Sequence, residues 1–440
     1  MSIFKEYDIR GKVPSEINEK TAYNIGLAAA KFLESKTLVV GMDGRSSSEK
    51  LKNALVRGIN DYGVDVIDIG LVPTPIFYHA VARMKKRGIM VTASHNPKEY
   101  NGFKISDERA VPFVYETGIN RIEQLVGKNI PKGKTRGKVY KKDIINSYIK
   151  YLKEKFSKNN YKKIYVIVDF SNGAAAVAKE IFGKLGIKNK IICGRIDGRF
   201  PCHGPNPLIK GSAAMLAKEV KKQKADFGVI FDGDADRVFF VDEKGDFVRT
   251  DYSFALLARD ALRKKKGKCY VDLRFSRVVY EEIERAGGEP VIMRVGNHFY
   301  KEALKKKGGV IGAEYSDHIM YRENYSIDDG IYAALKMTTL LANAGQKLSE
   351  LVYPLMRYFD SDEINFKVKN KDNVLNFIEK IYSDKIEMEL DGVSVYTHGY
   401  WFNVRKSNTE PIVRLKIEAA SKGILDKMIK KLRKEILSAE

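Results

Sequence analysis

The chain has 440 residues, which is more than one hydrophobic core supports, so we expect three or four domains. Its hydrophobic content of 44% is that of a globular protein, and no run approaches the ~18 apolar residues of a membrane span. The net charge of +22 invites a nucleic-acid partner. Much of the excess, however, lies in short lysine runs at predicted helix ends, without interleaved aromatic residues to stack on bases. We therefore expect no nucleic-acid and no membrane partner, and the charge favours an anionic small molecule instead.

The start of the chain and its cysteines indicate the cellular compartment in which the protein is expected. Residues 1–8 lack the shape of a signal peptide. Cys193, Cys202 and Cys269 form no CxxC pair, and their odd number argues against a disulfide framework. A reduced, cytoplasmic protein is the simplest interpretation, and the sequence leaves open whether it is a monomer or a homo-oligomer.

Strands and helices alternate over the first part of the chain. The pattern ends in an apolar strand that opens into the polar run Ser94-His95-Asn96-Pro97. Shortly afterwards Asn101-Gly102, between apolar residues, indicates a tight hairpin turn. The predicted elements are strand 37–42, helix 47–62, strand 64–69, helix 76–86 and strand 88–92.

The same alternation of predicted strands and helices occurs twice more along the chain. The second unit ends in strand 227–231, followed by Asp232-Gly233-Asp234-Ala235-Asp236-Arg237, and the third ends in strand 309–311, followed by Ala313-Glu314-Tyr315-Ser316-Asp317-His318. Alternating strands and helices predict largely parallel sheets, whose ligands gather beyond the carboxyl ends of the strands. The other predicted elements are strand 164–169, helix 173–185, strand 190–193 and helix 212–222 in the second unit, and strand 269–273, helix 276–286, strand 290–294 and helix 298–307 in the third.

The end of the chain has a different pattern. Predicted strands 393–396 and 412–417 flank the loop Arg405-Lys406-Ser407-Asn408-Thr409-Glu410-Pro411, and an amphipathic helix, 423–437, follows. We therefore expect an α/β protein with three consecutive βαβαβ-type domains of mixed, largely parallel sheets and a smaller C-terminal α+β domain, with the active site in the central cleft. The predicted domains are residues 1–145, 146–250, 251–355 and 356–440.

The acidic loop is a candidate metal site. Asp232, Asp234 and Asp236 alternate with small residues, so the backbone can curl and direct three carboxylates at one point. Hard oxygen ligands at this spacing suit Mg²⁺ or Ca²⁺. A calcium loop of the EF-hand type is excluded, because Arg237 stands where that loop needs glycine and a strand follows directly.

The other polar loops allow more than one interpretation. A guanidinium fork with clustered hydroxyls, as in the loop from Arg405 on, suits a phosphate dianion, but a polar hairpin turn fits as well. Glu314 and Ser316 suit sugar hydroxyls, although a plain turn is an equal alternative. Ser94 and His95 are adjacent, so in an extended chain they face opposite ways and would form no nucleophile–base pair. Neither a G-x-S-x-G elbow nor a P-loop occurs.

Three runs together resemble the α-D-phosphohexomutases: Thr92–Pro97, Asp232–Arg237 and Arg405–Pro411. The opening run Tyr7-Asp8-Ile9-Arg10-Gly11 is similar to the phosphomannomutase/phosphoglucomutase branch of that family. Asn101–Lys104 and Phe200–Pro207 are further family-like runs, so the resemblance spans the whole chain.

The resemblance implies an isomerase that interconverts hexose 1-phosphate and hexose 6-phosphate, of mannose, glucose or both. The reaction would pass through a phosphoserine at Ser94 and a hexose 1,6-bisphosphate, which is also the activator. Mg²⁺ would be held by Ser94, through its phosphate, with Asp232, Asp234 and Asp236. The implied catalytic residues are Ser94, His95, Lys104, Arg10 and Arg237, with the proton handled by Lys104 or His95. The implied substrate-binding residues are Tyr7, Arg274, Glu314, Ser316, His318, Arg405, Ser407, Asn408, Thr409 and Arg414.

The chain departs from the family pattern in the third loop. Members usually carry Gly-Glu-x-Ser-Gly-His where this chain has Ala313–His318. Asp317 in place of glycine is expected to add a charge beside the sugar and to resist a positive φ. The choice of sugar stays open for this reason. Glucosamine phosphate is an alternative substrate, and a non-catalytic phosphosugar-binding or nucleic-acid-binding relative is the alternative class.

Overall fold

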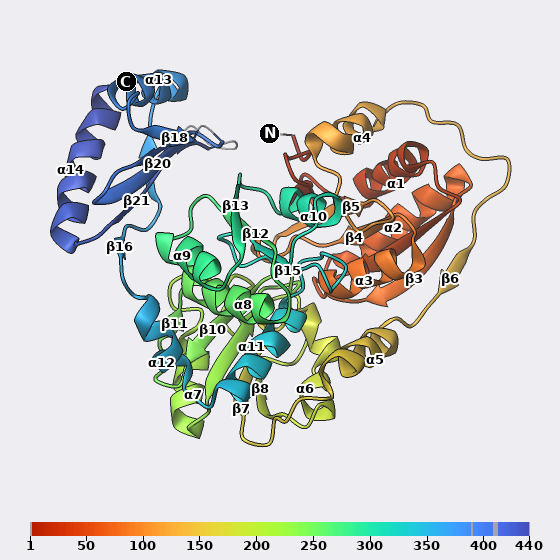
Figure 1. Ribbon diagram of the computed structural model, residues 1–440. Coiled ribbons are helices and arrows are strands. Elements are labelled where there is room, and N and C mark those ends of the chain that lie inside the picture. Colours follow the sequence, from red (N-terminus) through yellow and green to blue (C-terminus); the bar gives the residue numbers. More distant parts are fainter. Residues whose placement is uncertain (1, 389, 408–411, 440) are drawn as a thin grey trace.

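The computed structural model describes residues 2–388, 390–407 and 412–439. It contains four β-sheets that follow one another along the chain (Figure 1). The first three are mixed sheets with parallel centres and flanking helices, and the fourth is antiparallel, so the expected fold class is confirmed. The predicted domain boundaries at residues 145, 250 and 355 stay predictions.

The first sheet has the strand order β1-β5-β4-β2-β3-β6, with β2 parallel to β3 and β4. Asn101-Gly102 lies inside β5, opposite Gly11 and Arg10 of β1, so the predicted turn is wrong. A Cβ on Gly102 would lie 2.2 Å from the carbonyl oxygen of Ile9, and glycine therefore serves the close approach of two strands. The elements are β1 Ile9–Lys12, α1 Glu19–Leu33, β2 Thr37–Met42, α2 Ser48–Tyr62, β3 Asp65–Leu71, α3 Thr74–Met84, β4 Gly88–Val91, β5 Tyr100–Ser106, η1 Tyr115–Ile119, α4 Asn120–Leu125 and β6 Val139–Lys141.

The second sheet has the order β11-β10-β9-β7-β8. The α-helix predicted at 173–185 is wrong in its first half, because residues 174–178 form a 3₁₀ helix. The backbone amide of Ala174 donates a hydrogen bond to the carbonyl oxygen of Gly233, in the acidic loop, at 3.0 Å. The elements are α5 Ile145–Phe156, β7 Tyr165–Asp169, η2 Ala174–Ala178, α6 Ile181–Lys184, β8 Lys188–Ile192, α7 Ala214–Gln223, β9 Phe227–Phe231, β10 Val238–Asp242 and β11 Phe247–Val248.

The cysteine interpretation also needs correction. Cys193 and Cys202 form a disulfide, because the loop after β8 folds back and brings their Cα atoms to 6.3 Å. Cys269 is a buried free thiol. The odd cysteine count therefore did not exclude a single local bridge.

The third sheet, β13-β12-β14-β15, is parallel except for β15. The helix α11 packs near α8, β10 and α5, so it joins the third unit to the second. The elements are α8 Thr250–Lys264, β12 Lys268–Asp272, α9 Arg277–Arg285, β13 Glu289–Met293, α10 Asn297–Lys306, β14 Ile311–Ala313, β15 Ile319–Tyr321, α11 Gly330–Ala344, α12 Leu348–Val352 and η3 Tyr353–Leu355.

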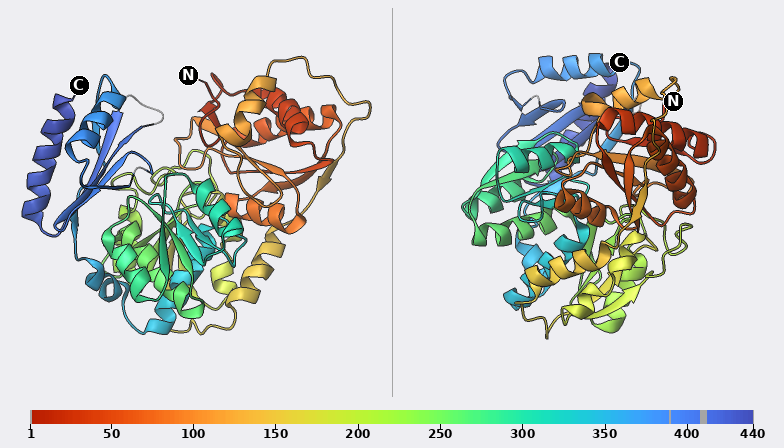
Figure 2. Two further views of the ribbon diagram at one scale, coloured as in Figure 1. Left: turned by 45° about the horizontal axis from the view of Figure 1, so that its top comes forward. Right: turned by 90° about the vertical axis from the view of Figure 1, so that its right-hand side faces the viewer.

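The C-terminal sheet packs against two helices, as expected for a small α+β domain (Figure 2). Arg405 and Lys406 end strand β20 and do not lie in a loop, because residues 400–406 pair with β21 over their whole length. The elements are β16 Phe359–Asp360, β17 Ile364–Lys367, α13 Lys371–Ile381, β18 Ile386–Met388, β19 Val393–Tyr396, β20 Tyr400–Lys406, β21 Ile412–Ala419 and α14 Lys422–Ser438.

The hydrophobic cores differ between these parts. One cluster of buried apolar side chains runs through the first three sheets, with Val39, Val168 and Val271 among its members. The C-terminal sheet has a core of its own, which includes Phe402 and Leu432.

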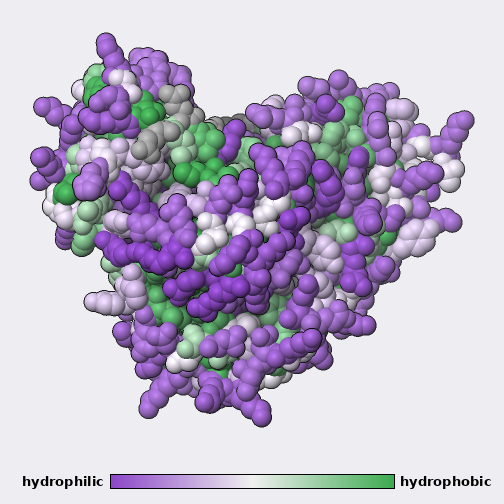
Figure 3. Space-filling view, in the orientation of Figure 1, coloured by the Kyte–Doolittle hydropathy of each residue, from purple (hydrophilic) through white to green (hydrophobic). Residues whose placement is uncertain are grey.

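Among the described residues no helix is long and apolar enough to cross a membrane. The face seen in Figure 3 is mostly hydrophilic, with a notch between the C-terminal and N-terminal parts.

Candidate active site

Three loops at equivalent positions build the site. In each of the first three sheets a parallel strand turns into an antiparallel neighbour: β4 into β5, β9 into β10, and β14 into β15. The connecting loops are those predicted from the sequence. Each contains a residue other than glycine in the left-handed region, Ser94 (φ 49°), Ala235 (φ 58°) and Asp317 (φ 66°). Such backbone strain is held only where surrounding structure enforces it, and it clusters at functional sites.

Ser94 connects the first loop to the second. Its hydroxyl donates to Asp232 Oδ2 at 2.8 Å, across the boundary between the first two sheets. Its Oγ also lies 3.3 Å from His95 Nδ1. The expectation that these neighbours face opposite ways is therefore wrong, because the left-handed φ of Ser94 bends the chain. A serine and an imidazole are thus placed together beside a carboxylate.

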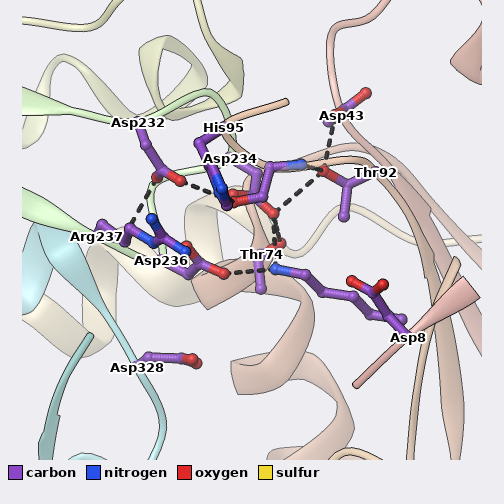
Figure 4. A network of polar contacts seen from close by, with 12 residues as sticks. Asp8, Asp43, Thr74, Thr92, His95, Asp232, Asp234, Asp236, Arg237 and Asp328 are labelled. Carbon is purple, nitrogen blue, oxygen red and sulfur yellow. Dashed lines mark hydrogen bonds and ion pairs between the residues drawn. The ribbon is translucent and has the colours of Figure 1, made fainter. Parts of the chain in front are cut away.

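The three aspartates of the second loop form a buried cluster (Figure 4). One carboxylate oxygen of each lies within 4.8 Å of the others, and the side chains are at most 1% exposed. Asp234 Oδ2 accepts hydrogen bonds from Thr74 Oγ1 at 2.5 Å and Thr92 Oγ1 at 3.1 Å. The cluster is thereby fixed to both α3 and the end of β4.

The only ammonium group in hydrogen-bond contact with the three aspartates, among the described residues, is that of Lys104. Its Nζ lies 3.0 Å from Asp234 Oδ2 and 2.5 Å from Asp236 Oδ2. Although burial acts to lower it, these two carboxylates raise the pKa of Lys104 well above its usual value. Burial, together with Asp236 and Asp234, raises the pKa of Asp232. The pKa of Asp232 stays raised despite the cations around the cluster, so a further cation beside Asp232 would stabilise its charged form.

The cluster fits a divalent cation held by oxygen ligands. Asp234 Oδ1 is buried and has no hydrogen-bond partner among the described residues, which leaves a ligand oxygen available. Three carboxylates that converge within 4.8 Å, with the Ser94 hydroxyl beside Asp232, supply the hard ligands that Mg²⁺ prefers.

The third loop surrounds His318. Its Nδ1 lies 2.9 Å from Ser316 Oγ and 3.1 Å from Glu314 Oε2, and its Nε2 lies 3.3 Å from Asp236 Oδ1. Although burial acts to lower it, Asp236 and Glu314 raise the pKa of His318 to about 9. His318 thus carries positive charge between the third loop and the acidic loop.

Asp317 does not behave as expected. Its backbone adopts the positive φ that was thought to exclude it, and its side chain turns away from the cleft to accept a hydrogen bond from Thr250 Oγ1 at 2.5 Å. The residue is 1% exposed and does not line the cleft. Thr250, the first residue of α8, thus provides a hydrogen-bond donor for the carboxylate that stands here in place of the glycine of the family pattern.

The loops enclose a cavity of about 520 Å³. Asp232 and Asp234 lie behind its wall, buried but in contact with residues that line it. Predicted site residues that line the cavity are Tyr7, Arg10, Ser94, His95, Lys104, Asp236, Arg237, Arg274, Glu314, Ser316 and His318.

The predicted phosphate-binding residues lie outside this cavity. Arg405 Nη2 contacts Glu363 Oε1 at 2.5 Å, and Arg414 Nη1 lies 3.5 Å from Glu363 Oε2. Glu363 is also 4.0 Å from Arg274, which does line the cavity. Ser407 is buried at the end of β20, and Asn408 and Thr409 lie outside the described residues. Glu363 therefore connects the C-terminal arginines to the cleft.

Two supporting residues were missed by the sequence analysis. The buried guanidinium of Arg45 donates to the carbonyl oxygens of Ser94 at 2.6 Å and Asn96 at 2.7 Å. Asp43 pairs with Arg45 at 3.2 Å and accepts from Thr92 Oγ1 at 2.8 Å. Both follow β2, the parallel neighbour of β4. Polar residues at the carboxyl end of that strand were the available signal.

Comparisons with known proteins agree along the whole chain. Models of the phosphoglucomutase/phosphomannomutase family match alpha/beta/alpha domain I at residues 1–132, domain II at 146–245, domain III at 249–359 and the C-terminal domain at 363–435. A phosphomannomutase of Vibrio cholerae is 38% identical, with 95% of this chain and 94% of that protein covered. A phosphomannomutase of Methanocaldococcus jannaschii is 33% identical, with 98% and 97% covered.

A solved structure agrees as well. A phosphoglucomutase/phosphomannomutase family protein from Burkholderia thailandensis has a TM-score of 0.90 at 28% identity, covering 99% of this chain and 97% of that one. Full-length matches of this kind place the protein among the phosphohexomutases, a class of isomerases. Within that class, the chain belongs to the phosphoglucomutase/phosphomannomutase family.

Proposed function

We propose that this protein interconverts the 1-phosphate and 6-phosphate of mannose, glucose or both, through a phosphoserine at Ser94 and a hexose 1,6-bisphosphate. The observation that carries the proposal is the 2.8 Å contact of the Ser94 hydroxyl with Asp232, inside a buried carboxylate cluster at the wall of the cleft. Phosphoryl transfer depends mainly on positioning and charge stabilisation, which such a site supplies. The matching relatives are named phosphomannomutases, which supports mannose as one sugar.

In the first half-reaction, the bond between phosphorus and Ser94 Oγ breaks as a bond to the free hydroxyl of the hexose monophosphate forms. That hydroxyl loses one proton, and Ser94 Oγ regains one. The bisphosphate then turns over, and its other phosphoryl group returns to Ser94. Of the two candidates for the serine proton, His95 faces the reacting oxygen at 3.3 Å, whereas Lys104 contacts two carboxylates. We assign the proton transfer to His95 on that geometry.

Asp232, Asp234 and Asp236 would hold Mg²⁺ together with an oxygen of the phosphoserine. When bound, the ion supplies positive charge that stabilises the transferring phosphoryl group. Arg10 and Arg237 line the same wall of the cleft and add fixed positive charge there. Glu314 and Ser316 contact the sugar hydroxyls in this proposal, and Arg405, Ser407 and Arg414 hold the phosphate that does not react.

Intact mass tests the central step. The purified chain should contain a fraction heavier by ~80 Da, the mass of one phosphoryl group, which mannose 1-phosphate or glucose 1-phosphate removes. Ser94→Ala should lack that fraction and lose mutase activity, even with the bisphosphate supplied. Ser46→Ala, which changes an exposed serine next to Arg45 in the chain, is the control. Unchanged activity in Ser94→Ala would overturn the proposal, and rates on mannose, glucose and glucosamine 1-phosphates would rank the sugars.

A further inference from the structure

A second cavity, of about 310 Å³, lies between α8, α11 and the β14–β15 pair, away from the cleft. The cleft loop leaves β14 at its carboxyl end, whereas this cavity is lined by Gly309 and Val310, which precede β14, and by Tyr321, which ends β15. The two cavities therefore lie at opposite ends of the same strand pair. The volume is within the range of small-molecule sites in proteins.

The charged side chains that line this second cavity are mostly cationic, and the carboxylate of Asp260 lies near Tyr321 and Lys336 without lining it. Lys264, Lys265, Arg322 and Lys336 line it, against the single carboxylate of Glu323. Lys264, Lys265 and Arg322 form no ion pair with any described residue. Glu323 is already engaged, since it accepts a hydrogen bond from Tyr332 Oη at 2.8 Å and contacts the Lys336 ammonium. The lining thus has an excess of three cations.

Tyr321 gives an independent indication of a ligand. It lines the cavity, is 2% exposed, and its hydroxyl has no hydrogen-bond partner among the described residues. A buried hydroxyl without a partner is unfavourable, because it has given up its bonds to water. Burial raises the pKa of this hydroxyl well above its usual value, so it remains a donor.

The ammonium group of Lys336 lies near the aromatic ring of Tyr321. Its Nζ lies 5.2 Å from the centre of the Tyr321 ring and 5.3 Å from that of Tyr332, and its side chain is 7% exposed. A buried ammonium, a buried hydroxyl donor and three exposed cations that line one cavity form the donor set that proteins use for phosphate.

We propose that this cavity, lined by Tyr321 and Lys336, is a binding site for a phosphate dianion, either free or as the terminal group of a small metabolite. The site is separate from the sugar-phosphate cleft and does not depend on the proposed function. The volume of about 310 Å³ against about 520 Å³ for the cleft suits a ligand smaller than a hexose bisphosphate.

Equilibrium dialysis of the full chain with radiolabelled inorganic phosphate tests the proposal. The charge-reversal variant Lys264→Glu/Arg322→Glu should bind one phosphate fewer per chain than the unchanged protein. The matched control Lys162→Glu/Lys163→Glu, which reverses two exposed lysines elsewhere, should bind the same number as the unchanged protein. Equal stoichiometry in the pocket variant and the control would overturn the proposal.

Tyr321→Phe provides a second measurement that a folding defect does not imitate. It removes only a hydroxyl without a protein partner, so the midpoint of thermal unfolding without phosphate should not fall. Phosphate affinity at this site should fall about 10-fold, the effect of one lost hydrogen bond to a charged group. Unchanged affinity would contradict the proposed role of Tyr321. A parallel arm with glycerol phosphate separates the sources: tighter binding assigns the site to a metabolite, and equal or weaker binding assigns it to free phosphate.

Discussion

The first two sheets and the C-terminal domain meet the cleft in different ways. Between the first two sheets the junction is buried, with Thr74 donating to Asp234 through both its amide at 2.9 Å and its hydroxyl at 2.5 Å. The same three-sheet hydrophobic core continues across that junction. The C-terminal domain has a separate core and meets the third sheet through polar contacts, such as Arg249 with Asp360 and Arg277 with Glu418.

The buried junction and the separate C-terminal domain suit different parts of the proposed reaction. In the proposed reaction Ser94 and the aspartates beside it must keep one geometry, and burial with the hydrogen bonds from Thr74 and Thr92 to Asp234 enforces it. Since the C-terminal domain has a separate core and meets the third sheet through polar contacts, we expect its position to change more readily than that of the first two sheets. Damage to the junction should therefore affect kcat, and damage to the C-terminal domain should affect KM.

The largest effect is expected at the junction. Asp232→Asn should weaken both the proposed Mg²⁺ binding and the contact with Ser94, so kcat should fall about 1000-fold. Steady-state rates over a Mg²⁺ titration measure this. Asp242→Asn, at the far end of β10 and outside the cleft, is the matched control and should stay within about 3-fold. A similar loss in both variants would mean that burial of any aspartate here is what matters.

The pH dependence of stability at His79 tests whether the junction between the first two sheets is buried. This fully buried residue of α3 packs against Tyr148 and Tyr151 of α5, and burial lowers its pKa to about 4. Because the unfolded chain binds the proton near pH 6.5, this residue's contribution to stability is complete above pH 6.5 and is lost as pH falls toward 4.

From pH 7.5 to pH 5 the unchanged protein should lose about 2 kcal/mol of unfolding free energy relative to His79→Phe. Urea unfolding of both chains at several pH values gives the difference, and groups common to both, such as Asp329 with its pKa raised to about 6 by burial, cancel. His79→Gln serves as a second neutral variant in case phenylalanine does not fit. A difference independent of pH would show that His79 titrates normally.

The C-terminal domain should respond through KM. Arg405→Lys keeps the charge but loses the fork that suits a phosphate, so KM should rise about 10-fold while kcat stays within about 3-fold. The exposed Arg433→Lys on α14 is the control. A fall in kcat without a change in KM would assign Arg405 to the transfer step and erase the contrast between the two regions.

Several residues singled out from the sequence come together at the cleft, whereas the packing around them was predicted less well. Ser94, Asp232 and Glu314 stand in short polar runs after apolar strands, and alternating elements place such runs at one edge of a sheet. Arg45 was missed because its role depends on a side chain that reaches under a distant loop. The Asn101-Gly102 turn was predicted wrongly because close strand pairing requires glycine for another reason. Long-range packing, which a local pattern does not contain, decided each of these cases.

The smallest effect is expected at Asp317, which tests whether the altered third loop selects the sugar. Since its carboxylate is buried against Thr250 and does not line the cleft, Asp317→Gly should change the ratio of kcat/KM for mannose 1-phosphate and glucose 1-phosphate by less than about 3-fold. Glycine accepts the φ of 66° without strain, so unfolding free energy should change by no more than about 1 kcal/mol. Ser316→Ala, one residue away but inside the cleft, should lower kcat/KM for both sugars about 10-fold. If Asp317→Gly shifts the ratio more than Ser316→Ala does, then the buried contact between the third loop and α8 controls the choice of sugar, although it does not line the cleft.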